Sequence, residues 1–315
     1  MRFKKSQIKA AKLFEKVSFI YKNYFLHDAM FKNQFKDGYT ALVCFLKNYA
    51  YERQGSPKAY SEIAVECVSR YKGEKEWEVP TEKDAEILWN HYKDIAKEEF
   101  NLIKKNKKTG KEEVKVNKSR NPMNNEKKDG IIDKLASENI QNLATHIRDL
   151  ISKGNTQDAH YFFVGGKVGK ELKPIRGIRG IGEKISSFYL RDIVYLAGLD
   201  EKNISDLYLL QPIDTWLEQT LKILFKSDVP QKLKEKQTLI VDLCKESGVS
   251  SISFNQGAWV LGSQIAGEFK KFNRILNDYA FAQKVIESHI EDKKEYLREV
   301  KNVLDSLHNA PYNNR

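Results

Sequence analysis

The chain has 315 residues, 41% of them hydrophobic, which is enough for one large domain or two modest domains with a real core. Its formal net charge of +11 at pH 7 favours a polyanionic partner, although charge alone identifies none. No run of about eighteen apolar residues is present, and the basic start is not followed by an apolar segment. We therefore expect no membrane span, no secretory signal and an intracellular location.

The predicted elements are helices almost throughout, because apolar residues recur three and four positions apart. In the first hundred residues, turn residues and apolar faces predict helices at about 6–24, at 39–51, from 58 onward and after Pro80-Thr81. The same spacing resumes at about 131–152. Farther along, helices are expected at about 215–225, 231–246, 256–272 and 277–307. With no strand-rich region and no internal repeat, the sequence predicts an all-α fold.

The segment 104–128 interrupts the helical pattern and carries ten basic residues against three acidic ones. It has few large apolar side chains and buries little surface, so we expect an exposed insertion or mobile loop. Contact with phosphates and a plain solvated charge run are both open for it. The chain then divides into N-terminal helices at 1–100, the insertion at 101–130, a central helical lobe at 131–226 and C-terminal helices at 227–315. The two terminal sets are expected to form one flanking lobe.

Cysteine and histidine usage predicts no metal centre. The cysteines Cys44, Cys67 and Cys244 are scattered, so we expect reduced, partly buried thiols and no disulfide framework, zinc ribbon or iron–sulfur cluster. The six histidines form no pair at metal-ligand spacing, so a metal-dependent nuclease is not indicated.

The most informative stretch is 174–194, which contains Ile178-Arg-Gly-Ile-Gly-Glu-Lys184. Pro174 suits the first turn of a short helix ending near Ile178. The glycines of Gly180-Ile181-Gly182 permit a tight turn and a close approach of backbone to a ligand. A second helix follows, and its predicted buried stripe is Ile185, Phe188, Tyr189, Ile193 and Leu196.

This turn is a candidate DNA contact. It directs backbone N–H groups to the start of a helix, where the helix dipole also favours an anion such as a DNA phosphate. The expected backbone-binding residues are Arg179, Gly180, Ile181 and Gly182, and such contact is independent of base sequence. An ordinary helix–helix turn is the alternative. A dinucleotide or P-loop site is not favoured, because no buried strand precedes the glycines and no Gly-Lys-Ser/Thr follows.

Two motifs together resemble the helix-hairpin-helix DNA glycosylase superfamily: Ile178-Arg-Gly-Ile-Gly-Glu-Lys184 and Gln211-Pro-Ile-Asp-Thr-Trp216. The resemblance implies a two-lobed fold with a DNA groove between the lobes. It also implies that Lys184 is the nucleophile of members with lyase activity and that Asp214 is the essential carboxylate. The thirty-position spacing of these two residues, with weaker echoes at 41–48, 59–64 and 255–262, is closest to the archaeal-type 8-oxoguanine branch. The basic insertion departs from the family pattern.

The chemistry needs both residue types. Cleavage of an N-glycosidic bond builds positive charge on the deoxyribose, which a carboxylate at Asp214 would stabilise. Asp214 also suits a helix N-cap, and the two roles are compatible. The Lys184 amine must lose its proton, which a helix N-terminus and burial would favour, before it attacks C1′ and forms a Schiff base. A lysine that merely contacts phosphate or solvent is the alternative.

A base inside a duplex must leave the stack before an enzyme can act on it. Trp259, with Gln256 one turn before it, is the candidate base pocket, and Tyr60 is a candidate opposite wall. Core packing is the alternative for this tryptophan. Three polar residues are candidates to fill the vacated space in the duplex: Asn48, Arg53 and Gln54.

These inferences converge on a monomeric, bifunctional DNA glycosylase and AP lyase without a cofactor. Its partner would be double-stranded DNA containing an oxidised base, with 8-oxoguanine the leading candidate. A monofunctional glycosylase for another lesion and a non-catalytic helix-hairpin-helix DNA-binding protein remain open alternatives.

Overall fold

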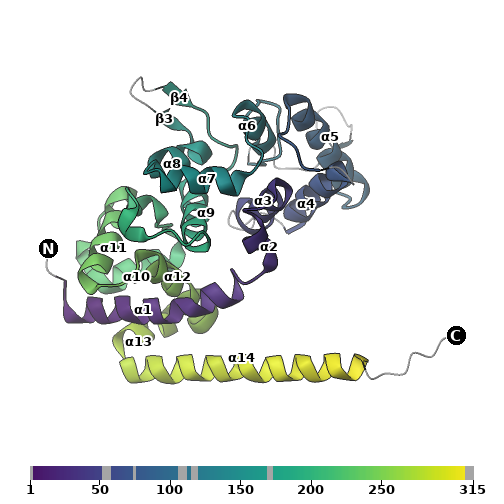
Figure 1. The fold of residues 1–315 in the computed structure, drawn as a ribbon. Coiled ribbons are helices and arrows are strands. Elements are labelled where there is room, and N and C mark those ends of the chain that lie inside the picture. The colour runs from purple at the N-terminus through teal and green to yellow at the C-terminus, as the bar shows by residue number, and fades with distance from the viewer. Residues whose placement is uncertain are drawn as a thin grey trace.

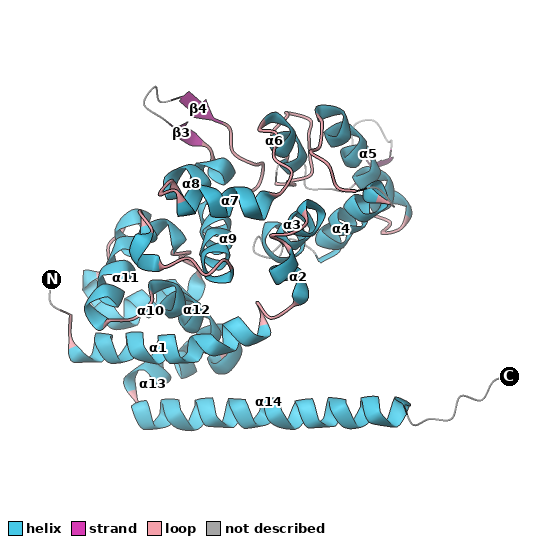
Figure 2. Ribbon diagram, viewed as in Figure 1, coloured by secondary structure: helices cyan, strands magenta, loops and turns pink. Residues whose placement is uncertain are grey.

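The computed structural model describes residues 3–51, 58–73, 76–105, 112–114, 120–168 and 173–308. Helices dominate the described residues, as the all-α prediction requires, and two short antiparallel hairpins are added to them (Figure 2). The buried apolar side chains form one cluster that runs from the first helix to the last. Among the described residues, no helix combines the length and apolar composition needed to cross a membrane.

The N-terminal third contains five α-helices and one π-helical turn. They are α1 (Lys5–Tyr24), α2 (Ala29–Asn33), α3 (Gly38–Phe45), the π-helix η1 (Leu46–Ala50), α4 (Lys58–Lys72) and α5 (Glu82–Glu98). Side chains fix where two of them begin: Asp37 accepts from the Thr40 amide ahead of α3, and Thr81 accepts from the Asp84 amide ahead of α5. The four helices predicted for this part are confirmed, whereas α2 was not predicted.

The described part of the expected basic insertion is only partly exposed. A short hairpin pairs β1 (Ile103–Lys105) with β2 (Glu112–Val114), and 106–111 and 115–119 lie outside the described residues. Asn121, Met123 and Asn124 are buried, and the Tyr51 hydroxyl donates to Asn121 Oδ1 at 2.6 Å. The prediction of an exposed loop is therefore wrong for 121–124, where amide side chains supply the buried partners that an apolar count overlooks.

The helix expected at 131–152 is two helices, α6 (Ile131–Ser137) and α7 (Leu143–Ser152). Asn139 takes a positive φ of 55° between them, and the Asn142 side chain accepts from the Thr145 amide to begin α7. Local side-chain hydrogen bonding thus breaks a helix that apolar spacing predicted to be continuous.

Helices α8 (Thr156–Val164) and α9 (Glu183–Leu196) pack against each other and are joined by a β-hairpin, β3 (Gly166–Val168) with β4 (Lys173–Ile175). Pro174 lies in β4, so the predicted short helix ending near Ile178 is wrong. The chain leaves α8, forms the hairpin and returns to the same place, where the Ile178 amide donates to the Phe163 carbonyl at 2.7 Å. Helix α8 is therefore the helix that precedes the turn and packs against α9.

The remainder of the chain is helical and contains short 3₁₀ and π segments. They are η3 (Glu201–Asn203), η4 (Leu207–Leu210), α10 (Thr215–Phe225), η5 (Lys226–Asp228), α11 (Leu233–Ser247), α12 (Ser251–Val260), the π-helix η6 (Leu261–Ala266), α13 (Phe269–Asn277) and α14 (Tyr279–His308). The continuous helix predicted at 256–272 is interrupted, because Gly267 adopts a φ of +70° and ends η6.

Helix α1 packs along α12 and α11, so the beginning of the chain meets its C-terminal part (Figure 1). The other N-terminal helices pack elsewhere: α3 contacts α7, and α5 contacts α6. Segment 1–100 is therefore divided between two groups of helices, which differs from the expectation that it forms one unit with 227–315. One group contains α1, α11, α12 and η4, and the other contains α3, η1, α4, α5, α6 and α7. Helix α9 contacts η1 in one group and η4 in the other, and it connects them through the core.

The two ends of the β3–β4 hairpin lie close together, and this contact gives a stability prediction. A Cβ on Gly177 would overlap the backbone of Val164 and stand 2.5 Å from the Gly165 nitrogen, whereas a Cβ on Gly182 would meet no atom within 4 Å. We expect Gly177→Ala to lower the free energy of unfolding by about 2 kcal/mol or more, since neither backbone segment can yield cheaply. Gly182→Ala is the control and should change it by less than about 1 kcal/mol. Urea denaturation measures both, and equal effects would contradict the close approach.

Candidate functional site

The Gly180 turn has a backbone that only glycine fits. Gly180 has a φ of +77°, and a Cβ there would overlap the Arg120 carbonyl. Ile178 and Ile181 lie on either side of it and are buried, with 3% and 6% of their surfaces exposed. Glycine is therefore needed at position 180 because the backbone of Arg120 passes close to it. The spacing of residues in the sequence did not indicate this contact.

Arg179 serves the turn structurally. Its guanidinium binds Asp129 Oδ1 at 2.6 Å and 2.8 Å, and its backbone amide donates to the Asp129 carbonyl at 2.7 Å. Because the side chain is only 9% exposed, it anchors the turn to the segment before α6 and does not project from the surface. The cation that the structure brings to this place is Arg120, which sequence reasoning missed.

An open hollow of about 480 Å³ lies over the start of α9. It is lined by Arg120 and by the residues of the turn and first helical turn, Gly180, Ile181, Gly182, Glu183, Lys184 and Ile185. Gly182 is the N-cap in extended conformation, and no side chain caps this helix. The first-turn amides, the positive end of the helix dipole and the side chains of Arg120 and Lys184 favour an anion in the hollow, whereas the Glu183 carboxylate opposes one.

Lys184 is the second residue of α9, and its side chain is exposed. The expectation that burial helps to deprotonate the amine is therefore wrong for the protein alone. The helix N-terminus is present as expected, and a ligand lying over the hollow would cover the amine. Its side chain borders the hollow.

Asp214 caps α10, and its Oδ1 accepts from the Leu217 amide at 2.8 Å. Burial raises the pKa of the Asp214 carboxyl above its ordinary value. The Leu217 amide, the Arg191 guanidinium, the Trp216 amide and the Lys184 ammonium oppose that rise. The structure thus brings the lysine and the carboxylate within electrostatic reach of each other, from separate helices.

A cavity of about 680 Å³ lies between the two groups of helices. Its lining comes from α1, the following loop, α2, α3 with η1, α4 and α12: Tyr21, Phe25, Leu26, Met30, Phe31, Val43, Lys47, Asn48, Tyr49, Lys58, Ser61, Glu62, Val65, Glu66 and Trp259. Trp259 packs edge-on against Tyr21 and Phe25, with ring centroids 5.7 Å and 5.0 Å apart. The predicted tryptophan and Asn48 therefore share one cavity.

The other predicted pocket residues lie elsewhere. Gln256 is fully buried and donates to Asp192 Oδ1 at 3.3 Å, and it does not line the cavity. Tyr60 packs against the core and its carbonyl accepts from Tyr92, while its neighbour Ser61 lines the cavity. The helix face was thus misplaced by one residue. Arg53 and Gln54 lie outside the described residues.

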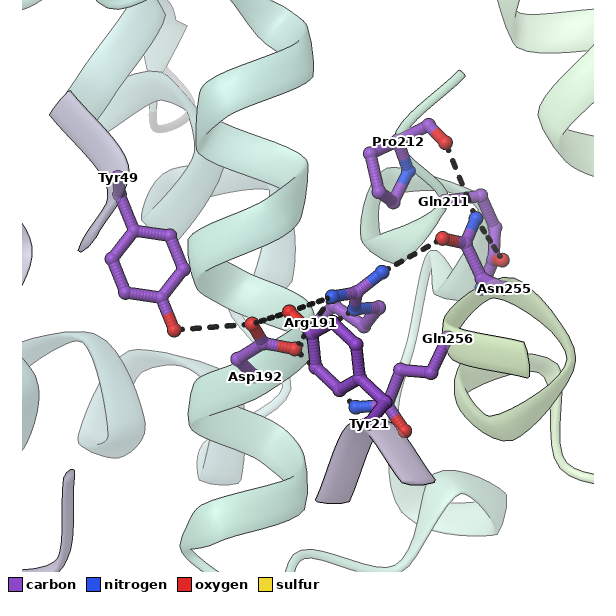
Figure 3. A network of polar contacts seen from close by, with 8 residues as sticks. All are labelled: Tyr21, Tyr49, Arg191, Asp192, Gln211, Pro212, Asn255 and Gln256. Atoms are coloured by element: carbon purple, nitrogen blue, oxygen red, sulfur yellow. Dashed lines mark hydrogen bonds and ion pairs between the residues drawn. The ribbon is translucent and has the colours of Figure 1, made fainter. Parts of the chain in front are cut away.

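A buried polar network beside Asp214 was also missed. Arg191 and Asp192, adjacent on α9, are both 0% exposed and paired through Arg191 Nε and Asp192 Oδ1 at 2.9 Å (Figure 3). The one available signal is that 185–194 is apolar on more than one face, which indicates burial all round. The network connects the cavity wall to the segment that precedes Asp214.

Comparisons with known proteins give no family assignment. No family model, curated protein or solved structure among those searched matches the chain. Among the described residues, no group of three or more histidine, cysteine, aspartate or glutamate side chains is placed to hold a metal ion. Any functional conclusion therefore rests on the arrangement of the Lys184 turn, the Asp214 cap and the cavity.

Proposed function

We propose that the protein is a bifunctional DNA glycosylase and AP lyase that removes an oxidised base from double-stranded DNA. The observation that carries the proposal is that Lys184 borders the hollow at the start of α9 and that its charge acts on the buried Asp214 carboxyl that caps α10. The family resemblance of the two motifs makes 8-oxoguanine the leading substrate. The chemistry needs no cofactor.

The hollow over α9 would bind a backbone phosphate. Arg120 and Lys184 supply positive charge there, and the amides at the helix start supply directed donors. Contacts of this kind carry no base information, which suits an enzyme that scans DNA of any sequence. Such binding weakens as salt rises, because counterions released from the DNA drive it.

The cavity between the helix groups would receive the extruded base. Its wall is mainly aromatic and aliphatic, with Trp259 at one side and the polar groups of Lys47, Asn48 and Glu62 at the rim. Aromatic and apolar surfaces recover part of the cost of unstacking a base, and polar groups can recognise its edge. Asn48 also donates to the Cys44 carbonyl at 3.1 Å, which fixes its orientation.

The two residues divide the chemistry. The neutral Lys184 amine attacks C1′, the N-glycosidic bond breaks, and its electron pair leaves with the base, which takes up a proton. Loss of the second amine proton and opening of the sugar ring at O4′ give the Schiff base. Removal of a C2′ proton then expels the 3′ phosphate and nicks the strand. Asp214 stabilises the positive charge that develops on the sugar.

A non-catalytic DNA-binding protein is the second candidate, and the exposure of Lys184 favours it. An exposed lysine beside an anion hollow is also what simple phosphate binding requires. The two candidates differ in covalent chemistry, since only a nucleophilic amine forms an imine with the sugar.

Borohydride reduction tests the nucleophile. With an 8-oxoguanine duplex, the protein should give a covalent DNA adduct, because borohydride reduces the Schiff base on Lys184 to a stable amine. Lys184→Gln should abolish the adduct. The control is Lys245→Gln, which changes an exposed lysine on a different helix, α11, and should leave the adduct unchanged. A gel shift of labelled protein reports the adduct. If the Lys184→Gln variant gave as much covalent adduct as the unaltered protein, Lys184 could not be the nucleophile.

Asp214→Asn tests the carboxylate. We expect the rate of base release in single turnover to fall about a hundredfold or more, since a group that stabilises transition-state charge is lost. Duplex affinity should stay within about threefold, and stability should be nearly unchanged because asparagine caps helices as well as aspartate. Filter binding and thermal unfolding measure these controls. A variant that retains the wild-type rate would contradict the assignment.

The raised pKa of Asp214 predicts a pH dependence. The carboxylate must be ionised to stabilise the sugar cation, so the rate should fall as pH decreases through this pKa. An ordinary aspartate titrates at about pH 4. Because burial raises the pKa of Asp214, the rate of base release should begin to fall at a higher pH than that. Single-turnover rates across that range give the profile. An identical acid limb in Asp214→Asn would show that another group controls it.

A further inference from the structure

A buried ion pair occupies the centre of the molecule. Arg191 and Asp192 have no exposed surface, and Arg191 Nη2 also lies 2.8 Å from Asp192 Oδ1. Removing two charges from water is costly, and apolar side chains of similar size often hold a core equally well. A gain in stability therefore does not explain the pair. Its hydrogen bonds hold other segments of the chain in place, and that positioning explains it better.

One branch of the network leads to Gln211 and Pro212, the residues shortly before Asp214 (Figure 3). Arg191 Nη1 donates to Asn255 Oδ1 at 2.8 Å, and Asn255 Nδ2 donates to the Pro212 carbonyl at 3.2 Å. The same amide lies 3.3 Å from Gln211 Oε1, and Gln237 holds the Gln211 carbonyl at 3.0 Å. Pro212 stands two residues before Asp214, so this branch fixes the chain where α10 is about to begin.

The other branch leads to the cavity. Tyr21 and Tyr49 donate to Asp192 Oδ2 at 2.7 Å and 3.1 Å, and both tyrosines line the cavity between the helix groups. Tyr21 also accepts from Arg191 Nη2 at 2.6 Å. The ion pair thus stands between the cavity wall on α1 and η1 and the segment that carries Asp214.

We propose that Asn255, held by Arg191, is the positioning residue that sets the Asp214 carboxylate relative to the cavity. The inference rests on the proposed function and extends it to a residue that touches no substrate. Rigid placement matters because a displacement of about 1 Å at a reacting centre can cost about a hundredfold in rate. The groups that face Asp214 are the Leu217 and Trp216 amides of α10 and the charges of Arg191 and Lys184 on α9.

Asn255→Asp tests the proposal most sharply. The new carboxylate can still accept from Arg191, but it has no N–H to donate to the Pro212 carbonyl. We expect base release from an 8-oxoguanine duplex to slow at least about tenfold, with duplex Kd within about threefold. Amide hydrogen exchange at Leu217, whose N–H is bound by Asp214, should quicken by a similar factor. Asn255→Ser also loses the reach to Pro212 and serves if the first variant fails to fold.

Ser186→Ala is the matched control. Ser186 is on α9, the helix that carries Arg191, and the change removes a buried 3.0 Å hydrogen bond to His160 that is not part of the network. This variant should keep both the rate and the Leu217 protection. Wild-type behaviour of Asn255→Asp, or equal losses in Ser186→Ala, would overturn the positioning role. If the unaltered protein releases no base, the proposed function fails, while exchange at Leu217 still decides whether Asn255 positions the cap.

Discussion

The Arg191–Asp192 pair is the constraint on which the arrangement of this molecule depends. A charged pair with no exposed surface must have every donor and acceptor met from within, and its partners come from α1, η1 and α12. Loss of one member would leave a buried charge uncompensated, at a cost of about 3–5 kcal/mol. Segments distant in sequence are therefore fixed relative to one another, between the wall of the cavity and the residues that precede Asp214.

A second constraint is the close contact between the backbone of the Gly180 turn and two other segments of the chain. Gly180 passes against the Arg120 carbonyl, and Gly177 passes against the end of α8, so the turn is located from two sides. These contacts explain why α9 begins without a side-chain cap and yet at a defined place. They also deliver Arg120, from a segment with many basic residues, to the hollow that Lys184 borders.

Sequence reasoning succeeded where the controlling interactions are local. Helix α10 begins after Asp214 because that side chain caps it, and both its bounds agree with the prediction. It failed where distant partners decide. Pro174 pairs within a hairpin, 121–124 is buried by contacts such as that of Tyr51, and Arg191 finds its partners on helices that no local pattern connects. The charge of Lys184 acts on Asp214, but their joint role stays a prediction. Gln256 and Tyr60 do not line the cavity in which they were expected.

The central claim is that an amine and a carboxylate act together on a base held outside the duplex. Duplexes that each carry one damaged base, with separate measurement of base release and strand cleavage, test it most directly. The account predicts release of 8-oxoguanine in preference to other lesions, followed by a nick on the 3′ side of the same nucleotide. Intact strands and no released base from every duplex, despite tight binding, would contradict it.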